Sequence, residues 1–321
     1  MSAATPSLAT IGILSIGDMG LGIAKLLHAQ GFEVATNCQG RSQDTIDRAQ
    51  KALVKLCSTD SELVSQCDVI LSVAPPRDAA EIAKRVAVAL ASDSTGQKRA
   101  STPLYFADMN AVAPSSVREI AKLFEPVKSL VHFVDGSIIG GPPSLKANSA
   151  DWSVPVLYMS GPQKLEDVEG WGPKLTVVLR MRHISEDIGA ASGLKMCFAS
   201  MSKGYTAIAI QAYTSAKSMG VLGELQEVLG EMVPDRAAQT ERGLVSMAPK
   251  AYRWVREMEE ISKTHVEEGG FGPELFLGAA DVYRSVADDT VLGGEKIGNR
   301  KRGTTADDIA AAMVEGLSQK K

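Results

Sequence analysis

Two lysines are the only charged residues in a helical pattern that runs from Gly189 to Ala216. A positive charge on such an apolar helix costs free energy when it is buried, unless it has a partner or a chemical role. Lys195 could donate a proton during a reduction, or accept one during an oxidation if burial lowers its pKa. The alternative is a side chain whose ammonium group reaches solvent. Lys203 lies eight residues further on and could bind an anionic substrate group or form a salt bridge within the protein.

A glycine-rich turn near the N-terminus has residue types that suit a bound pyrophosphate. The sequence Ser15-Ile16-Gly17-Asp18-Met19-Gly20 follows an apolar run and precedes a helical pattern. In the usual G-x-G-x-x-G spacing, Gly17 would let backbone N–H groups approach a phosphate, and Gly20 would let the helix pack on the strand. Ser15 occupies the first glycine position. The turn predicts a dinucleotide site that includes Asp18 and Met19, and a tight turn without a ligand is the alternative.

The end of the second expected strand indicates which dinucleotide binds. Sites for NAD(H) usually have a carboxylate there that binds the ribose 2′-hydroxyl group, but the segment 36–42 contains no acidic residue. Arg41 and Ser42 instead offer a guanidinium group and a hydroxyl group, which suit a 2′-phosphate. The alternative is that Ser42 caps the next helix and Arg41 is solvated. We therefore expect NADP(H) rather than NAD(H).

An α/β domain followed by a helical domain is expected to hold these residues. Apolar runs alternate with helical patterns in the first half, which predicts right-handed crossovers and a doubly wound, mostly parallel Rossmann sheet. We expect a flexible N-terminus over residues 1–8, an NADP-binding domain over 9–186, and an all-α domain over 187–321, joined by a long interdomain helix. The expected strands are 9–16, 32–37, 68–73, 104–107, 130–134, 154–159 and 175–179. The expected helices are 20–30, 42–56, 78–91, one from 114, 163–170, 189–216, 222–232, 236–248, 251–267, 271–287 and 305–317.

Composition argues against several classes of protein. The 34 basic and 38 acidic residues give a net charge of −4, without a basic patch that would indicate a nucleic-acid or membrane partner. Four cysteines and four histidines are scattered, so no metal site is predicted. No 18-residue apolar run suggests a membrane span. The N-terminus has no secretory pattern, and the thiols are expected to be reduced, so we expect a cytoplasmic protein.

Four segments together resemble the β-hydroxyacid dehydrogenase and 6-phosphogluconate-dehydrogenase-like superfamily. Their order is that of the family, and the resemblance extends over nearly the whole chain. The C-terminal half is similar to the branch with a phosphogluconate-dehydrogenase-like C-terminal domain of unassigned function, through Lys195–Ala199, Lys203-Gly204 and Arg253–Ile261. The four segments are Ile11–Leu27, Asp108–Ala111 with Pro114, Phe133–Gly141 and Gly189–Lys195.

The resemblance implies an NADP(H)-dependent oxidoreductase that transfers a hydride between nicotinamide and a carbonyl or hydroxyl carbon of a small, acidic substrate. Lys195 would be the general acid or base. The resemblance also implies a homodimer formed through the C-terminal helices, with a site in the cleft between the domains. The expected cofactor-binding residues are Gly17, Asp18, Met19, Gly20, Arg41, Ser42, Ala74, Pro75 and Asn110. The expected substrate-binding residues are Ser137, Ile139, Gly140, Gly141, Ser192, Phe198 and Lys203.

The sequence departs from the family pattern at three positions that usually carry polar side chains. Ile139 stands where the family often has a serine, and Phe198 and Ala199 stand where it often has asparagines. These groups hold a hydroxyacid, so their loss leaves two alternatives open. One is an imine reductase or reductive aminase, although Lys195 argues against it because those enzymes commonly lack this lysine. The other is a catalytically silent NADPH-binding dimer.

Overall fold

The chain divides into two compact units, residues 1–195 and 196–321, and each is described here by itself. The computed structural model describes residues 8–92, 99–296 and 298–319. The division falls inside helix α8 (Ala190–Ala199), a few residues after the boundary expected from the sequence at 186/187. The expected flexible segment 1–8 lies outside the described residues except for Leu8.

The first unit contains an eight-stranded sheet in the order β10-β9-β6-β5-β4-β1-β2-β3. Neighbouring strands are parallel, except that β6 and β9 are antiparallel. The chain order reverses between β1 and β4, where sheets of this topology bind dinucleotides at the carboxyl ends of their strands. The expected doubly wound α/β class is therefore confirmed. The strands are β1 (Thr10–Leu14), β2 (Glu33–Asn37), β3 (Lys55–Cys57), β4 (Val69–Ser72), β5 (Leu104–Asp108), β6 (Val131–Ile139), β9 (Val156–Ser160) and β10 (Met181–Ser185).

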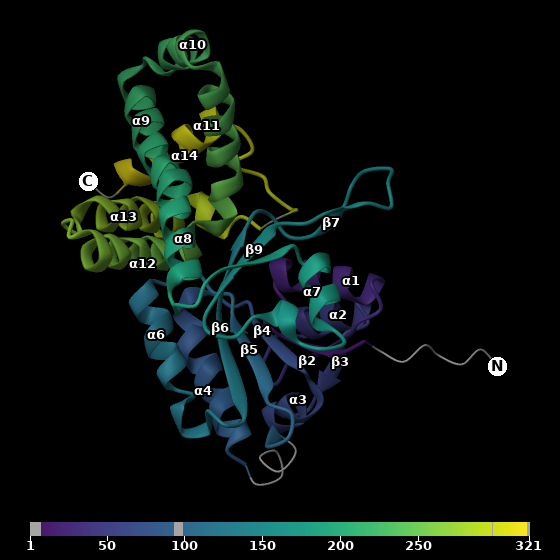
Figure 1. Cartoon of the computed structure of the whole chain (residues 1–321). Helices are drawn as coiled ribbons and strands as arrows, with labels where there is room; N and C mark the ends of the chain where they lie inside the picture. The colour runs from purple at the N-terminus through teal and green to yellow at the C-terminus, as the bar shows by residue number, and fades with distance from the viewer. Residues whose placement is uncertain (1–7, 93–98, 297, 320–321) are drawn as a thin grey trace. The chain divides into compact units, whose positions relative to one another are not determined.

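Helices cover both faces of this sheet (Figure 1). One core cluster joins apolar residues of α1, α2 and α7 to the sheet, and a second joins residues of α3, α4 and α6 to it. Strands covered on both faces are continuously apolar, and residues Val69 to Leu71 have no exposed surface. The helices are α1 (Asp18–Ala29), α2 (Gln43–Lys51), α3 (Asp60–Gln66), α4 (Ala79–Leu90), α6 (Pro114–Lys122) and α7 (Gly172–Val178). Short 3₁₀ turns are η1 (Pro76–Asp78), η2 (Glu125–Val127) and η3 (Leu165–Asp167), and β7 (Ser144–Leu145) pairs with β8 (Trp152–Ser153).

Three of the expected elements are wrong. Residues 175–178 form the end of α7 rather than a strand, with Leu179 as the C-cap residue, because a proline in the first turn favours a helix. Leu175 and Leu179, four residues apart, are both buried while Val177 is 76% exposed, which is a helical pattern. The helix expected over 42–56 stops at Lys51, and the edge strand β3 and helix α3 follow it. The helix expected over 163–170 is reduced to the 3₁₀ turn η3.

The second unit is helical, as the sequence predicts. The long helix expected over 189–216 is interrupted by a π-helical turn, η4 (Ser200–Gly204), and α9 then continues to Met219. Within the described part of this unit, only an isolated bridge between Lys296 and Asn299 pairs as a strand would. The helices are α9 (Tyr205–Met219), α10 (Leu222–Met232), α11 (Pro234–Met247), α12 (Ala251–Gly269), α13 (Glu274–Asp288) and α14 (Ala306–Ser318), with 3₁₀ turns η5 (Ala248–Lys250) and η6 (Val291–Gly294). None of the helices described, in either unit, has both the length and the apolar character that a membrane span requires.

Candidate active site

The turn between β1 and α1 has a shape that fits a bound pyrophosphate. Ser15 has a positive φ of 82°, and Gly17 is the N-cap residue of α1. A Cβ atom at Gly20 would lie 2.1 Å from the carbonyl oxygen of Ser15, so only glycine allows this helix to approach the strand. A Cβ atom at Gly17 would meet no heavy atom within 4 Å. The space over Gly17 is therefore open at the N-terminus of a helix, where anions bind.

The other predicted cofactor residues lie at the same edge of the sheet. Ala74 and Pro75 follow β4, and Asn110 follows β5, so the parallel strands bring these segments next to one another. The Asn110 side chain joins them directly: its Oδ1 accepts a hydrogen bond from Ala74 N at 2.6 Å, and its Nδ2 donates one to Ser72 Oγ at 3.0 Å. Asn110 thus holds two loops in place, and a direct contact with a cofactor stays a prediction.

Arg41 and Ser42 lie after β2 at this edge, and both are exposed. Arg41 N donates a hydrogen bond to Cys38 O at 3.0 Å and closes a turn. Ser42 is the N-cap residue of α2, but its side chain makes no capping hydrogen bond and instead lies 3.1 Å from Thr45 Oγ1. Ser42 therefore occupies the capping position considered from the sequence, but its side chain does not bind the helix N-terminus. Both side chains are exposed and so are accessible to a 2′-phosphate.

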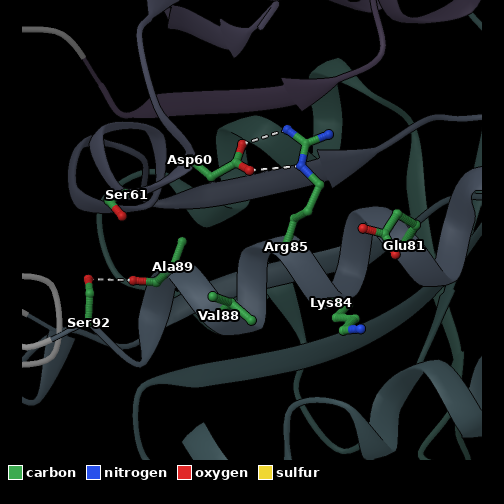
Figure 2. A pocket seen from close by; sticks show the side chains of 8 residues that line it. All are labelled: Asp60, Ser61, Glu81, Lys84, Arg85, Val88, Ala89 and Ser92. Carbon is green, nitrogen blue, oxygen red and sulfur yellow. Dashed lines mark hydrogen bonds and ion pairs between the residues drawn. The ribbon is translucent and has the colours of Figure 1, made fainter. Parts of the chain in front are cut away.

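A network that the sequence did not predict supports this turn. Asn37, the last residue of β2, donates from Nδ2 to Asp60 Oδ1 at 2.7 Å and accepts from Gln39 N at 2.8 Å. Arg85 of α4 donates to both oxygens of Asp60 at 2.8 and 2.9 Å, as Figure 2 shows. Asp60 and Arg85 also border a hollow of about 360 Å³ on the first unit. The network was missed because α3, which begins at Asp60, was not among the expected helices.

The predicted substrate loop contacts the helix of the glycine turn. β6 ends at Ile139, and Gly140 follows with a φ of 134°, a conformation that favours glycine. A Cβ atom at Gly22 of α1 would lie 2.8 Å from the carbonyl oxygen of Pro143. Because Gly22 has no side chain, the loop that contains the exposed residues Gly140 and Gly141 reaches α1. The two predicted binding segments are therefore neighbours within the first unit.

Ser192 is buried and hydrogen-bonded within the first unit, and its contact with a substrate stays a prediction. It has no exposed surface, and its Oγ donates to Asp135 Oδ1 at 2.6 Å. Asp135 accepts three further hydrogen bonds, from Ser160 Oγ, Gly189 N and Ser192 N, at 2.9, 2.9 and 3.1 Å. Ser137, two residues along β6, is also buried, and its Oγ has no hydrogen-bond partner among the residues that the structure describes.

Lys195 lies one turn after Ser192, half-buried at the end of the first unit. Its Nζ donates a 2.5 Å hydrogen bond to the carbonyl oxygen of Ile138. No salt bridge to Lys195 exists among the residues that the structure describes. Burial lowers the pKa of its ammonium group to about 8. An amine with this pKa exists in both protonation states near neutral pH, as a general acid or base requires.

Phe198 and Lys203 belong to the second unit, which is described by itself. Phe198 is 49% exposed. Lys203 forms a salt bridge with Glu257, and its ammonium group lies 5.0 Å from the ring centroid of Trp254. Of the two roles considered from the sequence, the salt bridge within the protein is the one observed. A contact between Lys203 and a substrate stays a prediction.

Asp108 at the end of β5 is a second buried acid that the sequence reasoning did not single out. It pairs in register with Asp135 across β5 and β6 and has no exposed surface. Its Oδ1 accepts a hydrogen bond from Asn110 N at 3.0 Å, while its Oδ2 has no partner within the described part of the chain. Burial raises its pKa to about 7, and the charge of Asp135 contributes to this rise. Across the described residues, no cluster of three His, Cys, Asp or Glu side chains could hold a metal ion.

Two family models match separate parts of the chain. The family described as "NADP oxidoreductase coenzyme F420-dependent" matches residues 10–95, and a domain of unknown function, DUF1932, matches residues 216–286. A relative from Methanothermus fervidus, an uncharacterized 28.5 kDa protein in the 7S RNA 5′ region, is 26% identical over 262 residues, which are 78% of this chain and 92% of the relative.

Solved structures share the fold over almost the whole chain. A 3-hydroxyisobutyrate dehydrogenase from Mycobacterium tuberculosis, with L-serine, is 19% identical with a TM-score of 0.62, covering 96% of this chain and 99% of that one. The chain therefore shares the fold of this dehydrogenase. An imine reductase from Myxococcus stipitatus in complex with NADP⁺ has the same fold at 16% identity and a TM-score of 0.51, covering 96% and 99% of the two chains. The match of residues 216–286 to a domain of unknown function confirms the expected C-terminal domain of unassigned function, and the solved structures confirm the expected fold.

Proposed function

We propose that the protein is an NADP(H)-dependent oxidoreductase that interconverts a carbonyl and a hydroxyl group on a small, acidic substrate, with Lys195 transferring the proton. The observation that carries the proposal is the amine of Lys195, which is half-buried, bound to a backbone carbonyl group and has a pKa lowered to about 8. The two dehydrogenase and reductase structures with the same fold support the reaction class.

The first unit has residues that would hold the cofactor at each of its charged groups. Gly17 to Gly20 would hold the pyrophosphate at the N-terminus of α1, and Arg41 with Ser42 would bind the 2′-phosphate. When bound, the nicotinamide supplies or accepts the hydride. The open space over Gly17 and the exposure of Arg41 support this assignment. The preference for NADP(H) over NAD(H) is part of the proposal.

Lys195 would transfer the proton at the substrate oxygen. In the reducing direction its ammonium group donates a proton to the oxygen of the carbonyl group, and in the oxidising direction its neutral amine accepts the hydroxyl proton. The carbonyl oxygen of Ile138 accepts one of its three N–H hydrogen bonds and so fixes the direction of the side chain. The exposed backbone at Gly140 and Gly141 would bind a carboxylate of the substrate.

The experiment that tests this proposal replaces Lys195 by alanine. We expect turnover of NADPH with a panel of small oxoacids to fall by about 10²- to 10⁴-fold, the usual contribution of a general acid. The dissociation constant of NADPH, measured by the quenching of protein fluorescence, should change less than twofold. Full turnover by the K195A variant would contradict the proposal.

An imine reductase is the second candidate. Apolar side chains at Ile139 and Phe198 favour it over a hydroxyacid dehydrogenase, and an imine reductase is among the structures with this fold. Parallel assays with carbonyl and cyclic imine substrates separate the two. If no carbonyl, hydroxyacid or imine substrate is turned over while NADPH still binds, the silent NADPH-binding protein considered from the sequence is favoured.

We propose a homodimer formed through the second unit, in the cytoplasm. A groove of about 490 Å³, which we call the α9–α13 groove, lies in this unit between η4, α9 and α13. Met201, Ile208 and Leu275 line it and are 79%, 57% and 66% exposed. Apolar patches of this kind usually mark an interface. The four free cysteines support a reducing compartment.

A further inference from the structure

Asp135 occupies an unusual position, because it is a fully buried acid that is bound almost entirely by the start of one helix. Three of its four hydrogen bonds come from Gly189 N, directly before α8, and from Ser192 N and Ser192 Oγ in the first turn of α8. The fourth comes from Ser160 Oγ on β9, which in turn accepts from Ala191 N at 3.0 Å. Two strands and one helix therefore meet at this carboxyl group.

The hydrogen bonds indicate an ionised carboxylate. A carboxylate has about four acceptor positions, whereas a protonated acid has a donor in place of one of them. All four partners of Asp135 are donors. Burial raises the pKa of Asp135, while the hydrogen bonds from Ser192, Ser160 and Gly189 oppose the rise. The positive end of α8 also favours an anion at this position.

The backbone at Gly189 is shaped for this contact. Its φ is 108°, in the region that favours glycine, and a Cβ atom there would lie 3.1–3.2 Å from Arg118 and Pro114 of α6. Arg118 Nε also donates to Ile188 O at 3.1 Å. The chain before α8 is thus held against α6 in a conformation that directs the Gly189 N–H group toward Asp135.

β6 contacts α8 a second time at Lys195. Ile138, three residues after Asp135 on β6, accepts the hydrogen bond from Lys195 Nζ, which lies three residues after Ser192 on α8. The same stretch of strand therefore binds the first turn of the helix by a carboxylate and the next turn by a backbone carbonyl group. A shift of α8 along β6 would break both contacts.

We propose that Asp135 is the positioning residue for Lys195: its carboxylate fixes the start of α8 on β6 and thereby holds the lysine amine against Ile138, out of bulk water. That the location of the lysine amine matters for turnover rests on the function proposed above. That Asp135 sets this location does not depend on the proposed function. In this proposal Asp135 is not in contact with the reacting atoms and acts through Ser192, Gly189 and Ser160, whose hydroxyl oxygen accepts from Ala191 N.

The test measures the titration of Lys195 in the free protein, without NADPH, by trace labelling with acetic anhydride across pH 6–11 and mass spectrometry. In the wild-type protein we expect a midpoint near pH 8. In the D135N variant the amine should reach water, and the midpoint should rise by about two pH units toward the ordinary value for lysine. Ser192→Ala removes one of the four donors and should give a smaller shift in the same direction.

Thr36→Val is the matched control. Thr36 is 1% exposed on β2, and its Oγ1 donates to Ile13 O at 2.6 Å, so this variant also loses a buried hydroxyl hydrogen bond. Its Lys195 midpoint should equal that of the wild-type protein. If D135N does not fold, as judged by circular dichroism, the Lys195 midpoint is measured in S192A and Ser160→Ala instead, and it should rise in both. If the folded D135N, S192A and Ser160→Ala variants all keep the Lys195 midpoint of the wild-type protein, the proposal is overturned.

Turnover separates this inference from the proposed function. We expect folded D135N to lose kcat by at least 10-fold while the dissociation constant of NADPH stays within twofold. If K195A retains full activity but the labelling midpoint still moves in D135N, the proposed function fails and the positioning role stands. If K195A is inactive and the midpoint does not move, the positioning role fails and the function stands.

Discussion

At the scale of single residues, the chemistry of the side chains predicts one part of the site and leaves another part unpredicted. Lys195 was predicted to matter because it is one of only two charged residues on an apolar stretch, where burying a charge costs free energy. The structure places it half-buried against a carbonyl group. Asp135 and Asp108 were not singled out, because their significance lies in partners up to 57 residues away in the chain. Ser192 was identified for its place on the helix, but the acceptor that uses its hydroxyl group was not visible from the sequence.

Asp108 gives a prediction for stability at the residue scale. Its pKa is raised to about 7 in the folded protein, from about 3.9 in an unfolded chain. The protonated acid therefore stabilises the fold fully below pH 4, and this contribution is lost as the pH rises through 7. D108N does not titrate, so the stability of the wild-type protein relative to D108N should fall by about 2–3 kcal/mol between pH 5 and pH 8.

Urea denaturation of both proteins at pH 5, 6, 7 and 8 measures this difference. As the pH rises, the urea midpoint of the wild-type protein should fall relative to that of D108N. A difference in unfolding free energy that is the same at all four pH values would show that Asp108 does not titrate in this range.

At the scale of elements, the strand–turn–helix units were largely predictable. The first strand, the glycine turn and α1 follow from local sequence, because an apolar run, a glycine spacing and an amphipathic pattern coincide there. The errors lie where local signals are short. β3 is three residues long and α3 is seven, so neither is long enough to show a period, and both depend on packing against the rest of the sheet.

The two glycines of the turn give a paired prediction at this scale. Gly20→Ala would place a Cβ atom 2.1 Å from Ser15 O, so it should destabilise the protein by roughly 1–3 kcal/mol, the range for overpacking, and shift the unfolding midpoint. Gly17→Ala meets nothing within 4 Å and should leave the unfolding midpoint unchanged. It should nevertheless weaken NADPH binding at least 10-fold, because the added methyl group occupies the space proposed for the pyrophosphate. Unaltered NADPH affinity in G17A would place the cofactor elsewhere.

The network behind β2 gives a second prediction at the element scale. Asp60→Asn removes the charge that holds both Arg85 and Asn37, and so loosens the turn that ends at Arg41. We expect the affinity for NADPH to fall more than the affinity for NADH, since only NADPH carries the 2′-phosphate. Titration of the wild-type protein and D60N with each dinucleotide, followed by fluorescence quenching, measures the loss of affinity for NADPH and for NADH. An equal loss for both would mean that the network does not support the 2′-phosphate site.

At the scale of the whole molecule, the two-part organisation was predictable from the change of pattern along the chain, from alternating strands and helices to helices alone. The boundary was not, because α8 runs across the division without a break in its local signal. The surface through which two copies of the chain would associate could not be predicted from the sequence either. Apolar residues on a helix have the same spacing whether they face a core or another chain, so the α9–α13 groove was not predicted.

The proposed homodimer is tested at this groove. Ile208 is 57% exposed on α9 and lines the groove, so Ile208→Glu should place a charge in the interface and convert the dimer to a monomer. Val177→Glu in the first unit, where Val177 is 76% exposed, is the control and should remain a dimer. Sedimentation equilibrium gives the mass of each. A monomeric wild-type protein, or a dimeric I208E variant, would contradict this assignment.

The central claim is that Lys195 transfers the proton, and the pH dependence of kcat for NADPH-driven reduction tests it most directly. With a donor whose pKa is about 8, kcat of the wild-type enzyme should be constant at low pH and fall tenfold for each pH unit above 8, as the ammonium group loses its proton. In K195A the residual kcat should be low and should lack this step. A wild-type profile without a step near pH 8, or the same step in K195A, would contradict the account.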